Sequence, residues 1–140
     1  MLPQEVLSAL SDKRFERPEA NRVDEALTRL DVSVSPTFRE FYSRYEGTFG
    51  SNVTGFELLD LCASEPSVVT STELCRAEHN IPHKALVLTD LLGGAVLMYE
   101  GDTDRVYNVD FEGGDQDFAA GRLEPMWKSF SEFLKWYFGS

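Results

Sequence analysis

Residues 86–111 constrain the fold of this chain more strongly than any other stretch. They contain three short segments rich in apolar residues, separated by clusters of Gly and Asp (86–88, 95–99 and 105–111). Short apolar runs bounded by turn-forming residues are typical of strands joined by tight turns. Because residues 95–99 include no polar residue before Glu100, we expect a central strand covered on both faces. Residues 105–111 alternate between two faces, which indicates a strand nearer the edge of the sheet.

Three stretches outside this region have the periodicity of amphipathic helices. Their apolar stripes follow the 3.6-residue repeat and consist of Val23, Ala26, Leu27 and Leu30; of Phe38, Phe41, Tyr42 and Tyr45; and of Phe130, Phe133, Leu134 and Tyr137. We expect the first of these helices to begin near Pro18. Ser35 and Pro36 are typical of a helix start, and Gly47 is expected to end that helix in a left-handed conformation. Ser129 and Glu132 predict a capping box for the last helix.

The remaining elements have weaker patterns. Residues 2–10 predict a short first helix, 56–61 a strand and 66–80 a helix; the Gly-rich residues 113–121 predict a flexible connection, and 124–127 a short extended piece. Strands joined by short loops rather than by helical crossovers favour an antiparallel sheet. We therefore predict an α+β fold in which N-terminal helices and a C-terminal helix pack on an antiparallel sheet. The 140 residues are expected to form a single domain, 1–140.

The sequence carries no signal for a membrane or for secretion. It has no apolar stretch of the roughly 20 residues that a membrane-spanning helix needs. Its first residues lack the basic start and the apolar core of a signal peptide. We therefore expect a cytoplasmic protein without membrane contact. Cys62 and Cys75 are the two cysteines, and we expect both to be reduced in that compartment.

Charge is the most unusual bulk property of the chain. It has 24 acidic and 13 basic residues, a net charge of −11. Residues 100–117 combine one base, Arg105, with seven acids: Glu100, Asp102, Asp104, Asp110, Glu112, Asp115 and Asp117. Nucleic-acid binding is disfavoured, because phosphates need Lys and Arg. A basic protein partner would be attracted instead, so we take these seven acids as the candidate partner-binding residues.

Other interpretations of this segment remain open. One is that the acids belong to solvated turns that keep the protein soluble. Asp110, Glu112, Asp115 and Asp117 also offer oxygen ligands to a cation, although their spacing does not match a calcium-binding loop. Trp127 and Trp136 either both belong to the core or one of them is exposed, and Trp136, which lies off the buried stripe of the last helix, is the better candidate for exposure. It is a candidate hot spot for a partner, or a contact in a weak homodimer of an otherwise monomeric chain.

No pattern in the sequence indicates catalysis or metal binding. Cys62, Cys75, His79 and His83 are zinc-binding residue types, but no pair has the spacing of a zinc knuckle. Cys75 and His79 share a helical face, yet nothing marks an orienting residue or oxyanion donors beside them. Motifs for phosphate, dinucleotide or hydrolase sites are missing from the sequence. We therefore expect no enzymatic activity, no cofactor and no metal.

Three segments in the expected order resemble the SUKH superfamily, which contains fungal cell-wall-synthesis regulators and many bacterial toxin-immunity proteins. Residues 34–47 are similar to its early helix, where a proline precedes an aromatic-rich stretch that ends in a glycine turn. Residues 86–110 are similar to its central strands, including the step Val106-Tyr107. Residues 126–138 are similar to its closing helix. The family often has Asn before the glycine that follows the early helix, where this chain has Glu46.

The resemblance implies an α+β domain without catalytic residues that acts by binding other proteins. The segments that carry it are mainly framework, so no partner-binding position is transferred from the family. Our leading hypothesis is an immunity protein that neutralises a cognate toxin by direct association. In this hypothesis an acidic surface covers a basic toxin domain such as a nuclease. The alternative is an intracellular regulatory scaffold without a toxin partner.

Overall fold

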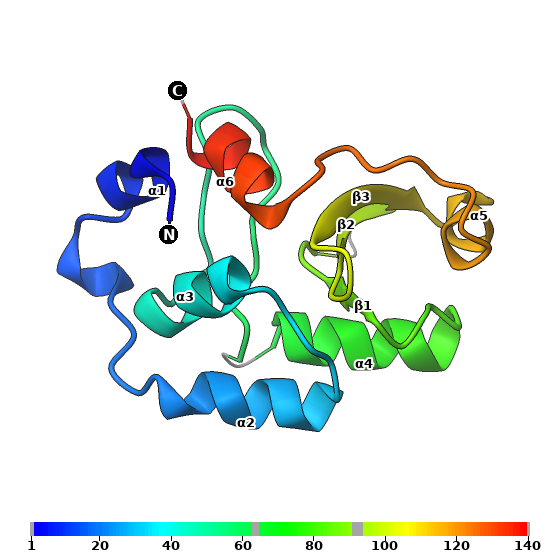
Figure 1. The fold of residues 1–140 in the computed structure, drawn as a ribbon, viewed down its shortest axis with the longest axis horizontal. Coiled ribbons are helices and arrows are strands. Elements are labelled where there is room, and N and C mark those ends of the chain that lie inside the picture. Colours follow the sequence, from blue (N-terminus) through cyan, green and yellow to red (C-terminus); the bar gives the residue numbers. More distant parts are fainter. Residues whose placement is uncertain (1, 63–64, 91–93, 140) are drawn as a thin grey trace.

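A three-stranded antiparallel sheet and six α-helices make up the fold of the described residues (Figure 1). The computed structural model describes residues 2–62, 65–90 and 94–139. In chain order the elements are α1 (Gln4–Ala9), a 3₁₀ turn (Lys13–Phe15), α2 (Asn21–Leu30), α3 (Pro36–Arg44), α4 (Val68–Glu78), β1 (Ala85–Val87), β2 (Ala95–Glu100), β3 (Arg105–Asp110), α5 (Gly114–Ala119) and α6 (Phe130–Phe138). The predicted α+β class and the antiparallel sheet are confirmed.

The strands follow the order β1-β2-β3, with Leu86 opposite Tyr99 and Met98 opposite Tyr107. Isolated bridges extend this sheet: Leu58 pairs with Phe49 and with Thr89, and Val106 pairs with Trp127. The strand predicted at 56–61 is therefore wrong. That segment joins the sheet through the bridges of Leu58 rather than through a ladder of its own.

Each face of the sheet is covered by helices. On one face, Leu86, Leu97 and Tyr99 join an aromatic core built with α3 and α6, where the rings of Phe38 and Tyr99 stack at 4.5 Å. On the other face, Val87, Val96, Met98, Tyr107 and Val109 pack on α4 and α5. Figure 1 shows α4 beside β1, and α1 close to α6. As predicted, β2 is buried on both faces, except at its exposed first residue, Ala95.

The helix ends agree with the sequence only in part. Ser35 Oγ accepts from Phe38 N, and Ser129 Oγ accepts from Glu132 N. The carboxylate of Glu132 accepts from Lys128 N rather than from Ser129 N, so the predicted capping box is only half formed. The helix expected from Pro18 begins at Asn21.

Gly47 does not adopt the predicted left-handed conformation, because α3 already ends at Arg44. Glycine is required there for a different reason. A Cβ atom on Gly47 would lie 2.5 Å from Cδ2 of the buried Phe49 ring.

The flexible connection predicted at 113–121 is also wrong, since residues 114–119 form α5. Asp110 holds the turn into this helix: its Oδ1 accepts from Glu112 N at 2.9 Å and from Gly114 N at 3.0 Å. Phe118 then packs on Tyr107, with ring centroids 4.8 Å apart. Within the described ranges, no helix is long and apolar enough to cross a membrane.

Candidate functional site

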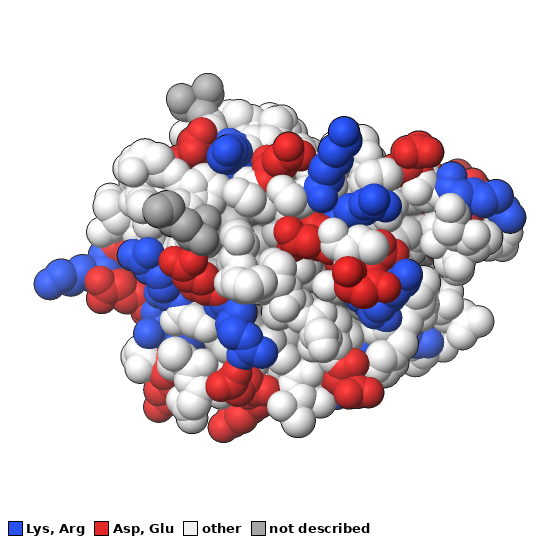
Figure 2. All heavy atoms as spheres, in the orientation of Figure 1, with Lys and Arg blue, Asp and Glu red and all other residues white. Residues whose placement is uncertain are grey.

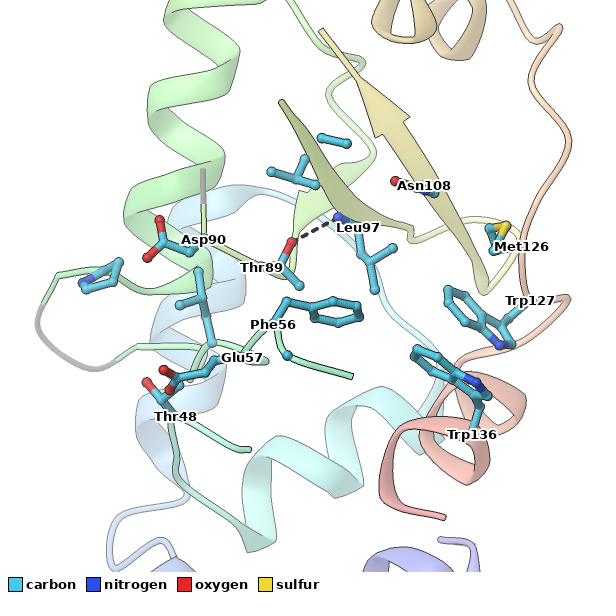
Figure 3. Close-up of a pocket in the computed structure, with 15 residues that line it drawn as sticks. Thr48, Phe56, Glu57, Thr89, Asp90, Leu97, Asn108, Met126, Trp127 and Trp136 are labelled. Atoms are coloured by element: carbon cyan, nitrogen blue, oxygen red, sulfur yellow. Dashed lines mark hydrogen bonds between the residues drawn. The ribbon is translucent and has the colours of Figure 1, made fainter. Parts of the chain in front are cut away.

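An open cavity of about 880 Å³ lies over the sheet at Ala95, Leu97 and Asn108 (Figure 3). Its volume is in the range of sites that bind ligands or partner side chains. One wall is aromatic and consists of Phe56, Trp127 and Trp136, with Met126 beside it. Glu57 and Asp90 lie on the other side of the cavity in Figure 3. We call this cavity the aromatic groove.

The aromatic wall combines Phe56 with two tryptophans, Trp127 and Trp136, that lie far from it in the sequence. The bridge between Val106 and Trp127 fixes Trp127 at the sheet edge. Trp136 projects from α6, with its ring 4.9 Å from that of Trp127 and 6.1 Å from that of Phe56. Trp136 remains 38 % exposed and Met126 58 % exposed. The predicted exposure of Trp136 is therefore confirmed, whereas the sequence did not indicate the groove itself.

Tyr137 holds in place the segment that carries Phe56 and Glu57. Its hydroxyl donates to the carbonyl oxygens of Phe49 and Phe56, at 2.6 and 3.0 Å, and accepts from Leu58 N at 2.9 Å. Burial raises the pKa of Tyr137 to about 12, so the group stays a neutral phenol at physiological pH. One side chain of α6 thus fixes the segment that carries Phe56 and Glu57.

A buried ion pair secures the other end of this segment. Arg17 Nη2 lies 2.6 Å from Asp60 Oδ1, and both side chains are almost completely buried. The guanidinium also donates to the carbonyl oxygens of Tyr42 and Tyr45, while Asp60 accepts from the backbone N–H groups of Gly47 and Cys62. Since each charge is paired and hydrogen-bonded, burial is tolerated. The pair connects the N-terminal segment, α3 and the loop that forms one side of the groove.

The charged side chains among the described residues that line the groove are acidic. Glu57 is exposed and Asp90 half-buried, and no Lys, Arg or His is among the described residues that line the cavity. Neither carboxylate forms an ion pair within the described part of the chain. Between the acids and the aromatic wall, the hydroxyl of Thr89 accepts from Leu97 N at 3.0 Å, which uses one of its two lone pairs.

The acidic segment 100–117 does not form one continuous surface. The hairpin of β2 and β3 places residues 100–104 at one end and 110–117 at the other. Strands of six residues at about 3.3 Å per residue separate the two ends by roughly 17 Å. On the face shown in Figure 2, acidic and basic side chains are interspersed. The seven acids are thus divided between two turns.

In the first turn, two of the three acids support the fold. Glu100 is buried, accepts from Thr103 Oγ1 and lies 3.2 Å from Lys84 Nζ. Asp104 has a left-handed backbone; its carboxylate accepts from Tyr99 Oη at 2.8 Å and from Phe130 N, the first residue of α6, at 3.4 Å. Asp102 is exposed and lies 3.4 Å from Lys84.

In the second turn, the Asp110 carboxylate accepts hydrogen bonds from the backbone. Its bonds from Gly114 N and Glu112 N lower the pKa of the carboxyl below its ordinary value. Glu112 is exposed, and Asp115 is half-buried in the first turn of α5. Asp117 pairs with Arg122 at 3.0 Å. Of the predicted set, Asp102, Glu112 and Asp117 are thus the acids that face solvent without holding the backbone.

The zinc-type residues are engaged separately. Cys62 Sγ accepts from Arg17, His79 stacks on Phe111 at 4.2 Å, and His83 bonds to the Asp31 carbonyl. Burial raises the pKa of Cys75 to about 11, which leaves it a protonated, weakly nucleophilic thiol. Across residues 2–62, 65–90 and 94–139, no three His, Cys, Asp or Glu side chains gather where they could hold a metal. Both cysteines are free thiols.

Comparison with known proteins identifies the family. The sequence model of the SMI1 / KNR4 family (SUKH-1) matches residues 18–136, which is most of the chain. Proteins of this family are toxin-immunity or regulatory proteins and are generally non-catalytic. A search of the curated proteins finds no match. The three framework segments that resemble the superfamily lie within the matched range, apart from the last two residues of α6. The chain belongs to the SMI1 / KNR4 family, SUKH-1.

Proposed function

We propose that this chain is an immunity protein that neutralises a cognate toxin by direct association. The observation that carries the proposal is a net charge of −11 in a member of a family of immunity and regulatory proteins. Such a charge attracts a basic partner and repels nucleic acid. The partner that fits best is a basic toxin domain such as a nuclease, whose active-site cleft the bound chain would occlude.

The outward-facing acids contribute to association mainly through their electrostatic attraction for a basic partner. Asp102, Glu112 and Asp117 are exposed or half-exposed at the two ends of the hairpin, and two of them already have basic neighbours. Exposed charges of this kind raise association rates more than they raise affinity. Glu100, Asp104 and Asp110 are engaged within the fold, so we do not include them among the docking groups.

The proposal is tested in cells. An immunity gene should lie beside a toxin gene, and the toxin from that neighbouring gene is expressed with and without this chain. Survival of the host only when the chain is present, together with a direct complex of the two purified proteins, supports immunity. Absence of a complex, or no protection at a molar excess of the chain, contradicts it and favours a regulatory scaffold.

A further inference from the structure

The aromatic groove exposes the side chains that most often dominate protein interfaces. Among the described residues, the large hydrophobic side chains that are most exposed are Val53, Leu74, Met126 and Trp136, and the last two line this one cavity. Trp is enriched at binding hot spots, and Met adapts its shape to different partners. Trp136 is also supported from behind by Trp127 and Phe133, with ring centroids at 4.9 and 6.4 Å. The aromatic wall is therefore a firm surface ready for an apolar side chain.

The acidic side of the groove adds a second requirement. Glu57 and Asp90 lie opposite the tryptophans in Figure 3, and no described lining residue carries a positive charge. Because neither acid has an ionic partner within the described chain, a cation brought there would replace no existing pair. A ligand that complements the groove is thus apolar at one end and cationic at the other.

We infer that the groove seats a segment of the protein partner that places an aromatic or long aliphatic side chain on Phe56, Trp127 and Trp136, and a Lys or Arg on Glu57 and Asp90. A polypeptide can supply both features, since an extended chain advances about 3.3–3.6 Å per residue and can span an open groove. The inference rests on the proposed function in one respect, which is that the partner is a protein. It assigns the contact to the groove rather than to the acidic turns.

The chain contains a built-in reporter for this inference. It has two tryptophans, Trp127 and Trp136, and both line the groove. Intrinsic tryptophan fluorescence therefore reports on this site alone. The probes are acetylated and amidated hexapeptides of Gly and Ser that carry one Phe and one Arg, separated by one to four residues. Two matched sets replace the Arg by Glu or the Phe by Ser.

We expect the best Phe/Arg peptide to bind about tenfold more tightly than its Phe/Glu counterpart, because the charge at the acidic end changes from attraction to repulsion. The Ser/Arg set should not change the fluorescence. Equal binding of the Phe/Arg and Phe/Glu peptides would overturn the inference and indicate a purely apolar site. No fluorescence change with any Phe/Arg peptide at millimolar concentration would overturn it as well.

Two variants of equal charge localise the effect. Glu57→Lys and Glu112→Lys each replace an exposed glutamate and change the net charge from −11 by the same amount, but only Glu57 lines the groove. Glu57→Lys should abolish the preference for Arg over Glu, whereas Glu112→Lys should leave it. The same loss in both variants would show that the preference reflects overall charge, which contradicts the inference.

The aromatic end is tested by Met126→Ala and Trp136→Ala, with Leu74→Ala on α4 as the control for an exposed hydrophobic residue outside the groove. The Met126 side chain is mostly solvent-exposed, so its variant should fold even if Trp136→Ala is destabilised. Both groove variants should weaken binding of the Phe/Arg peptide, and Trp136→Ala should weaken it by roughly 30-fold.

The peptide titrations need no toxin. If the chain binds these peptides but does not protect cells, the proposed function is wrong and this inference stands. If the chain protects cells but does not bind the peptides, this inference is wrong and the proposed function stands.

Discussion

The acidic segment and the aromatic groove are two regions that differ in how their side chains are used. In segment 100–117 three of the seven acids are engaged within the fold: Glu100 is buried, Asp104 connects the hairpin turn to α6, and Asp110 holds the turn into α5. In the groove, Glu57 and Trp136 remain available on the surface. Density of charge in the sequence is therefore a poor guide to the availability of charge on the surface.

The largest effect is expected at Asp60, an acid that supports the groove from inside. Asp60→Asn keeps the shape of the side chain but leaves the buried Arg17 guanidinium without its counter-charge. Breaking a buried pair in this way costs about 3–5 kcal/mol of the free energy of unfolding. Urea denaturation measures the loss. Adding Arg17→Met to Asp60→Asn should recover part of it, and a single variant within 1 kcal/mol of the parent chain, on the order of a surface change, would contradict this role.

The next effect concerns binding at the groove. Trp136→Ala removes an exposed indole from the aromatic wall, and truncation of such an anchor costs about 2 kcal/mol of binding free energy. Calorimetry with the purified toxin measures this loss, and Leu74→Ala serves as the control. If both variants bind the toxin as tightly as the parent chain, the groove is not the contact surface.

Within the first acidic turn, we expect two neighbouring aspartates to behave differently. Asp104→Ala removes the acceptor for Tyr99 Oη and Phe130 N and places Ala at a left-handed backbone position, which should lower stability by about 1–2 kcal/mol. Asp102→Ala removes only an exposed pair with Lys84, which is worth about 0–1 kcal/mol. Thermal denaturation compares the two. Equal losses would show that the turn does not distinguish structural acids from solvated ones.

The smallest effect is a pH dependence localised at α5. The pKa of Asp110 lies below its ordinary value of 3.8, because Gly114 N and Glu112 N donate to the charged form. The charged carboxylate therefore stabilises the turn above pH 3.8, and this contribution is lost as the pH falls through the lower pKa of the folded chain. NMR exchange of the Gly114 amide should accelerate in that range. The Asp110→Asn variant should lack this step, and an identical pH profile in both would contradict the assignment.

The strongly periodic parts of the fold were predictable because their patterns follow directly from burial. The stripes of α2, α3 and α6 and the apolar runs of the hairpin are buried as expected. The errors occur where particular side-chain contacts, rather than hydrophobic periodicity, determine the local structure. Gly-rich residues 113–121 look flexible in sequence, but Asp110 and the packing of Phe118 on Tyr107 select a helix. Gly47 is required by the ring of Phe49 rather than by its own backbone.

The candidate site was predictable only at one residue. Trp136 could be found because it lies off the apolar stripe of its helix. The rest of the groove combines Phe56 and Glu57, Asp90, the sheet floor and Trp127, and no local pattern links these segments. Arg17 and Asp60 are 43 residues apart, and no local pattern in the sequence indicates that they pair. Local periodicity encodes the elements, whereas the site depends on how they pack.

The most direct test of this account measures association and dissociation rates of the toxin complex for two variants. Glu112→Lys changes only an exposed charge, so we expect it to slow association at low salt without changing the dissociation rate. Trp136→Ala changes the groove, so we expect it to accelerate dissociation by roughly 30-fold with little change in association. The reverse assignment, with dissociation controlled by Glu112 and unaffected by Trp136, would contradict the conclusion that the turns steer the partner and the groove holds it.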